Sequence, residues 1–535
     1  MEDGGSEQRT RLNAGNADMA TAVLPAEAVE PRTKSNVRYA FTCAILASMA
    51  SIVLGYDFGV MSGASLYIKK DLNLTDVQLE ILIGIMNLYS LIGSLAAGRT
   101  SDWIGRRRTV LLVAAIFVSG SLLMGLAVGY AMLMAGRFVA GVGVGYAIVV
   151  APVYTAEIAP ASARGFLTSL PDAFINFGVL LGYLSNFAFA RLPLRLGWRV
   201  MLGAGAAPAA LLTLLVLVLP ESPRWLVMQG RLADAGAVLE RTSRTPEEAA
   251  ERLASIKAAA GIPSDLDANG DVVSVPTEQK NRDETRVWKE LVFAPSPAMR
   301  RILLTALGVQ FFQQASGIDA VLLYSPRVFQ SAGIAGDNRL LGATCAVGAT
   351  KTLFILVATF LADRVGRRPL LLSSAGGMAI VLVGLATGLT VVGHHPSAEI
   401  TWAVALCIVS TLAYVSFFSV GLGPLTSVYT TEVFPLRVRA LGFGVGVTCN
   451  RVTSGVISMS FLSLSRAVTI GGSFFLYAGM AALACLFFFV FLPETRGLTL
   501  EETAKLFGVA ADDTGMEAEG PAGKDKAVEI EMPTN

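Results

Sequence analysis

Charged residues are scarce in this chain: of its 535 residues, 16% are Asp, Glu, Lys or Arg, and 53% are hydrophobic. A soluble globular domain usually carries about 25% charged residues, and a disordered chain has few aliphatic residues, so both classes are excluded. The charges also balance, with 42 Lys and Arg against 41 Asp and Glu. Nucleic-acid binders usually have a basic surface, which this balance does not support. The remaining class is a polytopic membrane protein.

Cysteine and histidine are also rare, with 5 Cys and 2 His. The cysteines lie singly inside apolar stretches without a CxxC pair, as small buried hydrophobic residues do. His394 and His395 fall in a predicted outer loop with no ligand partners nearby in the sequence. Metalloprotease, hydrolase and phosphate-loop motifs are missing from the sequence. We therefore expect no cofactor, no metal site and no enzymatic activity.

Apolar stretches of membrane-spanning length dominate the chain. A spanning helix needs about 20 largely apolar residues, because lipid offers no partner for backbone N–H and C=O groups. Twelve stretches meet this requirement: 38–66, 79–98, 109–127, 131–152, 167–190, 198–219, 301–326, 340–362, 369–393, 400–425, 438–464 and 470–492. The largest polar interruption, from Glu221 to Arg300, divides them into six and six.

The predicted organisation follows from these spans. It consists of a polar cytoplasmic N-terminal segment (1–37), a six-helix bundle (38–220), a cytoplasmic central loop with short amphipathic helices (221–300), a second six-helix bundle (301–492) and a cytoplasmic tail (493–535). The orientation rests on the short Arg-dense loops at 99–108 and 364–368, since such loops face the cytoplasm. Arg191, Arg195 and Arg199 would then lie outside, and they argue for the opposite orientation.

Three motifs recur in the same order in the two halves. YTAEIAP at 154–160 returns as YTTEVFP at 429–435, DWIGRR at 102–107 returns as DRVGRR at 363–368, and LPES at 219–222 returns as LPET at 492–495. Mixed-charge motifs at corresponding loops indicate homologous halves rather than a bias of composition. Transporters are built from such repeats, because two pseudo-symmetric bundles can rock about a site at the middle of the membrane. We therefore predict an all-α membrane protein with twelve transmembrane helices in two pseudo-symmetric six-helix bundles.

The motifs also resemble those of a known family. GRTSDWIGRR at 98–107, PESPR at 220–224, PETRG at 493–497 and QQASGI at 313–318 are similar to the sugar porter branch of the major facilitator superfamily. The resemblance extends from about Tyr39 to Phe507. GYD at 55–57, LPDAFINFG at 170–178 and GIDA at 317–320 resemble the plant polyol and monosaccharide proton symporters. The resemblance implies the major facilitator fold and import of a polyol or monosaccharide with a proton by alternating access.

Ionisable residues well inside the predicted spans are few. They are the acids Asp57, Asp172 and Asp319 and the bases Arg137, Lys351 and Arg451. A charged side chain at the middle of the bilayer costs about 3 kcal/mol on insertion scales, so these residues must face the bundle interior, a water-filled cavity or one another. Each could serve transport or belong to a structural ion pair between spans.

Asp57 is the main candidate for proton coupling, with Arg137 as its partner. A carboxylate in a cavity that is alternately hydrated and closed can exchange a proton as the conformation changes. The resemblance implies the same pair, since proton-coupled sugar porters carry an acid at this position and passive ones generally do not. We therefore expect symport. A passive uniporter and a membrane sensor that binds sugar without moving it are the alternatives.

Amide side chains are candidate substrate ligands, because an amide matches both the donor and the acceptors of a hydroxyl group. Gln313 and Gln314 lie in the seventh span and Asn450 in the eleventh. The resemblance places such residues at the sugar site. Adjacent glutamines diverge by about 100° on a helix, so one of them could instead hold a contact between helices.

Asp172, Asp319 and Lys351 stand where the family has neutral ligands. Ionised carboxylates accept several hydrogen bonds, which suits a flexible polyol rich in hydroxyl groups. Lys351 could touch the substrate or neutralise one of the two acids. Ser427 stands where most relatives have a tryptophan that stacks on the sugar, so we expect weaker affinity, a shifted substrate range or a sensor function.

The charged residues of the repeated motifs form a predicted cytoplasmic gate. They are Asp102, Arg106, Arg107, Glu157, Arg164, Asp363, Arg367, Arg368, Glu432 and Arg439. Ion pairs among them could close the inner side when the bundles meet and separate when it opens. Positive charge that only marks topology is the alternative. In the tenth span, Gly421, Gly423 and Pro424 predict a bend.

The predicted partners are a polyol or sugar, a proton and the lipid bilayer, without nucleic acid. We expect a monomer in the plasma membrane, with the vacuolar or another internal membrane as the alternative.

Overall fold

The computed structural model describes residues 30–160, 163–260, 262, 295–395, 400–435, 438–496 and 506–507. Most of the predicted N-terminal segment, the later part of the predicted central loop and the C-terminal tail lie outside these residues. The described chain is helical, without a strand in those ranges.

Each of the twelve predicted spans coincides with one helix or with two consecutive helices. The first half contains α1 (Glu30–Leu72), α2 (Asp76–Ile104), α3 (Arg106–Gly125), α4 (Tyr130–Ile158), α5 (Arg164–Phe189), α6 (Leu194–Gly203) and α7 (Ala206–Val216). The second half contains α12 (Pro297–Ala315), α13 (Ile318–Ser331), α14 (Asp337–Val365), α15 (Arg367–His394), α16 (Thr401–Val420), α17 (Leu422–Val433), α18 (Arg439–Val468) and α19 (Ile470–Phe491).

Within the described residues, 10 helical segments are long and apolar enough to cross a membrane by length and composition alone. The other two predicted spans, 301–326 and 438–464, correspond to α12 with α13 and to α18. These are the spans that carry Gln313, Gln314, Asp319, Asn450 and Arg451. Their polar side chains lower the hydropathy of the two spans, which is expected of helices that line a polar interior.

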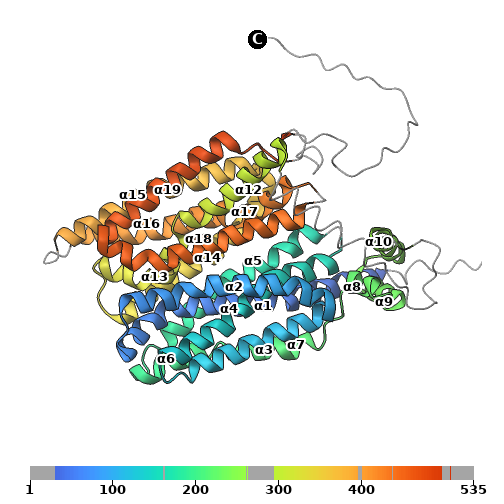
Figure 1. The fold of residues 1–535 in the computed structure, drawn as a ribbon, viewed down its shortest axis with the longest axis horizontal. Helices are drawn as coiled ribbons and strands as arrows, with labels where there is room; N and C mark the ends of the chain where they lie inside the picture. Colours follow the sequence, from blue (N-terminus) through green and yellow to red (C-terminus); the bar gives the residue numbers. More distant parts are fainter. Residues whose placement is uncertain are drawn as a thin grey trace, which may run out of the picture.

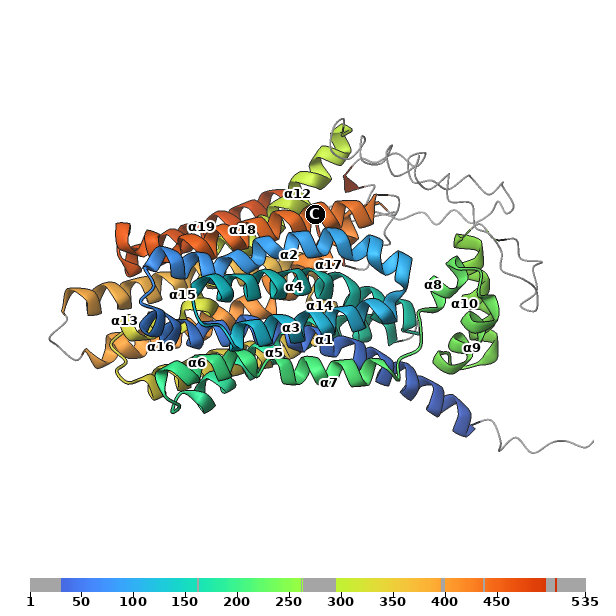
Figure 2. The ribbon, with the colours of Figure 1, turned by 60° about the horizontal axis from the view of Figure 1, so that its bottom comes forward.

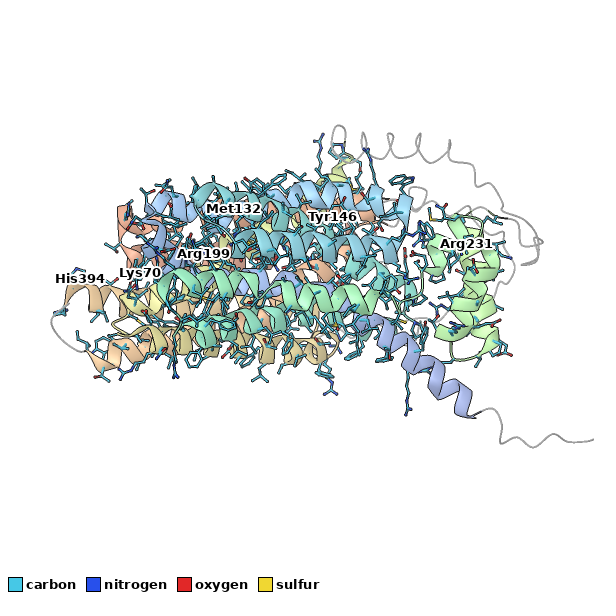
Figure 3. The ribbon with its side chains drawn as sticks, turned by 90° about the horizontal axis from the view of Figure 1, so that it is seen from below. Lys70, Met132, Tyr146, Arg199, Arg231 and His394 are labelled. Atoms are coloured by element: carbon cyan, nitrogen blue, oxygen red, sulfur yellow. The ribbon has the colours of Figure 1, made fainter. Side chains whose placement is uncertain are left out.

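The helices of the two halves lie side by side, with α1–α7 on one side of Figure 1 and α12–α19 on the other. The main contacts between the halves join α2 to α18 and α5 to α14. Figure 3 shows Lys70, Arg199 and His394 near one end of the bundle and Arg231 near the other. We call these the outer and inner ends, following the orientation predicted from the Arg-dense loops.

Two of the three arginines that argued against this orientation pair with one acid at the outer end. Arg199 forms an ion pair of 3.1 Å with Asp71, and Arg195 lies 3.8 Å from the same carboxylate. Arg199 also donates to the carbonyl of Ala127 at 3.0 Å. The positive-inside rule counts basic residues whether or not they are paired, so the orientation stays a prediction from the Arg-dense loops.

Close packing of α1 on α5 positions the buried acid of α1. A Cβ atom on Gly55 would lie 2.0 Å from the carbonyl oxygen of Ile175, and one on Gly59 would lie 2.2 Å from that of Val179. Only glycine allows the two backbones to approach so closely, as small residues do between membrane helices. Asp57 lies between these two glycines in the sequence and points away from α5, toward Arg137 on α4.

Two spans of the second half are broken in their middle. Gly317 has a φ of 87° in the left-handed region, and a Cβ atom there would lie 2.7 Å from the ring of Tyr477. This glycine ends α12 and begins α13, so the span predicted over 301–326 consists of two helices. Gly421 separates α16 from α17, which confirms the predicted bend in the tenth span.

Three short helices of the central loop lie at the inner end, namely α8 (Pro223–Met228), α9 (Leu232–Thr242) and α10 (Pro246–Ala259) (Figure 2). Hydrogen bonds are among the described contacts that attach them to the first half. The indole nitrogen of Trp225 donates to the carbonyl of Asp102 at 2.9 Å, and Arg252 donates to the carbonyl of Ala159 at 3.1 Å. The second contact satisfies a carbonyl at the C-terminal end of α4, where helical partners run out.

Candidate functional site

Asp57 on α1 and Arg137 on α4 form a buried ion pair. The distance from Arg137 Nη1 to Asp57 Oδ2 is 3.3 Å, and the two residues are 1% and 5% exposed, respectively. The same Nη1 lies 3.0 Å from the sulfur of Met86. Arg137 Nε is buried and has no hydrogen-bond partner among the described residues. The guanidinium is therefore only partly satisfied, and its main counter-charge is the carboxylate of Asp57.

The amide side chains predicted for substrate binding meet where α12, α17 and α18 converge. Asn450 Nδ2 donates to Gln313 Oε1 at 2.6 Å and to the Gln310 carbonyl at 3.2 Å. Gln314 Nε2 donates to Asn450 Oδ1 at 3.1 Å. Gln310, which the sequence prediction did not include, reaches Thr430 Oγ1 at 3.2 Å. The structure thus brings the three predicted amides together and adds a fourth.

The two adjacent glutamines play different structural roles. Gln313 Nε2 donates to the carbonyls of Leu422 at 2.8 Å and Gly423 at 2.9 Å, which α17 exposes just after the break at Gly421. Gln313 therefore holds the start of α17 and is the glutamine that makes a contact between helices. Gln314 Oε1, by contrast, is buried without a hydrogen-bond partner among the described residues. It leaves one acceptor available for another group.

The four other charged residues within the membrane surround this cluster without direct ion pairs to one another in the described chain. Asp319, in the first turn of α13, accepts a hydrogen bond from Ser454 on α18. Arg451 interacts electrostatically with Asp319 and Asp172, and Lys351 interacts with Asp319. Asp172 lies on α5 and keeps an exposed surface in the structure. The charges therefore share one polar region but are free to take another partner.

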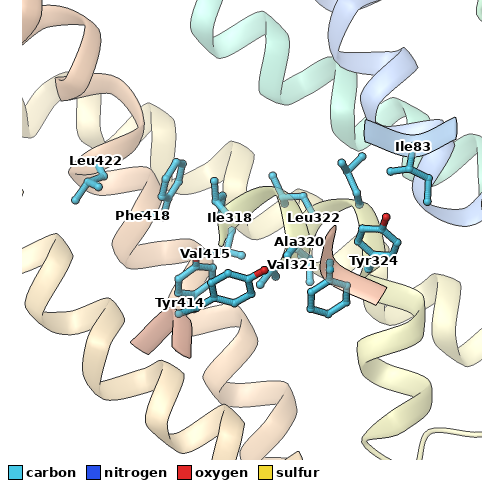
Figure 4. Packing of buried hydrophobic residues seen from close by; sticks show 14 of the residues in the cluster. Ile83, Ile318, Ala320, Val321, Leu322, Tyr324, Tyr414, Val415, Phe418 and Leu422 are labelled. Carbon is cyan, nitrogen blue, oxygen red and sulfur yellow. The ribbon is translucent and has the colours of Figure 1, made fainter. Parts of the chain in front are cut away.

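Aromatic and aliphatic side chains border this polar region at the start of α13. Figure 4 shows Val415 and Phe418 of α16 beside Ile318. Tyr414 donates to the carbonyl of Ser316 at 3.0 Å, which satisfies the backbone at the break. The ammonium of Lys351 lies 6.0 Å from the centre of the Phe418 ring, at the limit of a cation–π contact. Ser427 lies half-buried on α17. Because it is a serine, this position offers no aromatic ring on which a sugar could stack.

The repeated motifs at the inner end form one cluster in each half. In the first half, Arg106 pairs with Glu157 at 3.1 Å and with Asp102 at 2.9 Å. Arg107 donates to the carbonyl of Leu217 at 2.6 Å. Ser222 donates to Glu157 at 2.5 Å, which connects the third repeated motif to the first.

The second half repeats these contacts. Arg367 pairs with Glu432 at 3.0 Å, Thr495 donates to Glu432 at 2.7 Å, and Arg368 donates to the carbonyl of Phe489 at 2.8 Å. Arg439 donates to the carbonyl of Phe434 at 3.1 Å. The side chains of Arg164 and Asp363 lie outside the described part of the chain.

Two glutamates missed by the sequence prediction complete the clusters. Glu221 accepts hydrogen bonds from the backbone nitrogens of Arg106 at 2.8 Å and Arg107 at 3.1 Å, at the N-terminus of α3. Glu494 accepts from the backbone nitrogens of Arg367 at 3.0 Å and Arg368 at 3.1 Å, at the N-terminus of α15. Each carboxylate satisfies helical N–H groups without partners and complements the helix dipole. The recurrence of LPES and LPET was the signal for both.

The predicted closing of the cytoplasmic gate by ion pairs between the bundles stays a prediction. The ion pairs described at the inner end each join two residues of the same half, so they do not bridge the bundles in this structure. Hydrogen bonds described between the halves lie midway or at the outer end. Thr352 donates to the carbonyl of Asn176 at 3.1 Å, and Tyr183 donates to that of Leu322 at 2.8 Å. The described contacts between the halves therefore hold the bundles together at the middle and at the outer end.

Comparisons with known proteins agree with this architecture. A family model described as sugar (and other) transporter matches residues 43–507. Polyol transporter 5 of Arabidopsis thaliana is 58% identical over 486 residues, which cover 91% of this chain and 88% of that protein. The glucose transporter GlcP of Staphylococcus epidermidis is 33% identical over 458 residues, which cover 86% of this chain and 95% of that protein.

Solved structures give the same result. The proton:xylose symporter XylE bound to 6-bromo-6-deoxy-D-glucose is 28% identical, with a TM-score of 0.70, and the match covers 88% of this chain and 100% of that one. The inward open conformation of XylE from E. coli is 26% identical, with a TM-score of 0.71 and the same coverage of 88% and 100%.

Proposed function

This chain belongs to the sugar (and other) transporter family, and we propose that it imports a polyol or monosaccharide together with a proton. It is an integral multi-pass membrane protein of the major facilitator fold. The polyol transporters among its relatives and the proton:xylose symporter among its structural neighbours support this function.

The observation that carries proton coupling is the buried pair of Asp57 and Arg137. Protonation of Asp57 would leave the Arg137 charge without its main counter-charge, because Nε of Arg137 has no partner in the described chain. An uncompensated buried charge is unfavourable, so the protonation state of Asp57 and the packing of α1 on α4 are coupled. Since α1 also packs closely on α5, a rearrangement at Asp57 can reach the substrate region on α5.

Substrate binding is assigned to the polar region between the halves. Gln314, with its free acceptor, and the carboxylates of Asp172 and Asp319 are the proposed contacts to substrate hydroxyls. Asn450 orients Gln314, and Gln313 positions the broken tenth span. Lys351 is proposed to balance Asp319 electrostatically. Carboxylates accept but do not donate when ionised, so this set favours a substrate that presents many hydroxyl donors.

An uptake assay in a host that lacks sugar and polyol transport tests this function. Adding a polyol or sugar to unbuffered cells should raise the external pH while labelled substrate accumulates. Saturable uptake without alkalinisation would indicate a uniporter, and binding without uptake would indicate a sensor. A panel of sugars and polyols offered as competitors then identifies the substrate.

The Asp57→Asn variant tests the assigned residue. It should lose accumulation against a gradient and substrate-dependent alkalinisation while still exchanging labelled for unlabelled substrate. Asp71→Asn, which removes an acid at the outer end of the same helix, is the matched control and should keep alkalinisation. Full uphill uptake by Asp57→Asn would contradict the assignment.

A further inference from the structure

The outer ends of α2 and α18 are joined across the two halves by a buried carboxylate. Glu80 on α2 is 1% exposed. Its Oε1 accepts from the backbone nitrogen of Ser463 at 2.6 Å, and its Oε2 accepts from the Ser463 hydroxyl at 2.5 Å. Hydrogen bonds to an ionised carboxylate are short and strong, so both oxygens of Glu80 are committed to the opposite half.

A second contact lies one turn nearer the outer end. Asp76 on α2 forms ion pairs with Arg466 on α18 and with Arg327 on α13, the latter at 3.6 Å. Lys69, in the same half, also pairs with Asp76. Residues four apart lie on one face of a helix, so Asp76 and Glu80 present a continuous acidic edge to α18. Ser463 and Arg466, three apart, form the matching edge.

The two helices are also in direct contact below these residues. A Cβ atom on Gly84 would lie 2.4 Å from the Met459 side chain and 2.8 Å from its backbone nitrogen. Nothing can pass between α2 and α18 at this level without separating them. Separation would break every bond that Glu80 makes to Ser463 and every bond that Asp76 makes to the second half.

We propose that Glu80 and Asp76, with Ser463 and Arg466, form the outer gate of the transport cycle and set how strongly the outward-open state is disfavoured. This inference rests on the proposed function only in assuming that the two halves move apart at their outer ends. Glu80 should contribute more than Asp76. Asp76 borders a cavity of about 440 Å³ that Lys69, Arg327 and Arg466 also line, whereas Glu80 is shielded from water.

Labelling of a buried cysteine from outside tests the gate without requiring transport. The reporter is Ser458→Cys on α18, fully buried beneath the gate, in a full-length chain whose native cysteines are replaced. A membrane-impermeant maleimide added outside should label it slowly. Glu80→Gln can still accept from the Ser463 nitrogen and donate to the Ser463 hydroxyl oxygen, but it removes the negative charge that strengthens both bonds. It should raise the labelling rate about tenfold, as expected when a buried hydrogen bond to a charged group becomes a neutral one. Asp76→Asn should raise it by a smaller factor.

Two further variants make the result decisive. Ser463→Ala removes only the hydroxyl bond and should raise the labelling rate even if Glu80→Gln folds poorly. Asp337→Asn is the matched control, because Asp337 also faces the opposite half, at 3.9 Å from Lys70, but in an exposed pair. Its rate should stay within twofold of the parent. Unchanged labelling in both Glu80→Gln and Ser463→Ala, with monodisperse protein, overturns the gate. If the uptake assay shows no substrate-dependent alkalinisation, symport is overturned instead. The labelling rates still test the outer gate, because labelling does not require transport.

Discussion

The Asp57–Arg137 pair makes a prediction about stability that is separate from transport. Asp57→Asn leaves Arg137 buried, with one nitrogen already without a partner in the described chain. Removing one member of a buried ion pair costs about 3–5 kcal/mol. The asparagine oxygen can still accept a hydrogen bond, so we expect a loss of about 3 kcal/mol, at the lower end of that range.

A second substitution should recover most of this loss. Arg137→Met in the Asp57→Asn background removes the uncompensated charge and places a thioether beside Met86, which lies 3.0 Å from the guanidinium in the native chain. Replacing a buried ion pair by apolar groups of similar volume is often neutral or stabilising. The double variant should therefore be more stable than Asp57→Asn and still lack proton coupling.

Thermal unfolding of the purified proteins in one detergent measures the order of stability, and proton uptake in vesicles measures coupling. The expected order of Tm is wild type, then the double variant, then Asp57→Asn. If the double variant melts below Asp57→Asn, the charge of Arg137 is not what destabilises the single variant, and the electrostatic reasoning fails. If the double variant keeps substrate-dependent alkalinisation, the pair does not couple the proton.

Two further predictions concern the broken seventh span and its glutamines. Gly317→Ala should lower Tm and uptake, because a residue other than glycine in the left-handed region costs about 1–2 kcal/mol and the new Cβ atom would meet Tyr477. Gly479→Ala is the control: a Cβ atom there meets open space, so neither Tm nor uptake should change. Gln314→Leu should raise KM about tenfold, as for the loss of one hydrogen bond to substrate, and it should also lower Tm because the buried Asn450 Oδ1 loses its donor. Gln313→Leu should lower Tm, and an unchanged Tm there would contradict its contact role.

The spans and the buried pair could be predicted because both follow from local chemistry. Lipid requires long apolar helices, and an acid and a base within them need partners, so Asp57 and Arg137 were an expected pair. The roles of Gln313 and Gln314 could not be separated in this way. Both lie in α12, and their roles depend on which neighbouring helix each one faces: Gln313 meets the start of α17 and Gln314 meets α18, which the sequence does not reveal.

The residues of the predicted cytoplasmic gate could be identified from the sequence, but their partners could not. A repeat establishes that Arg106 corresponds to Arg367, but it does not say whether each pairs within its own half or across to the other. Glu221 was visible in a repeated motif, yet its contacts are to backbone nitrogens, which leave no pattern of opposite charge. Glu80 falls at the edge of a predicted span, where a charge costs little, so its burial between two helices depends on tertiary packing alone.

The placement of the ionic contacts has a consequence for how the halves can move. The inner clusters tie the third, fourth and sixth spans of the first half together, and the matching clusters do the same in the second half. Contacts of this kind make each half rigid, which rocking about a central site requires. In the proposed cycle, a rigid half would transmit a change at Asp57 to its outer end, where Glu80 and Asp76 meet the other half. The charged residues of the repeated motifs therefore form contacts within each half. Glu80 and Asp76 of α2, which have no counterpart in the repeat, form contacts between the halves, and in the proposed cycle these are the contacts that break.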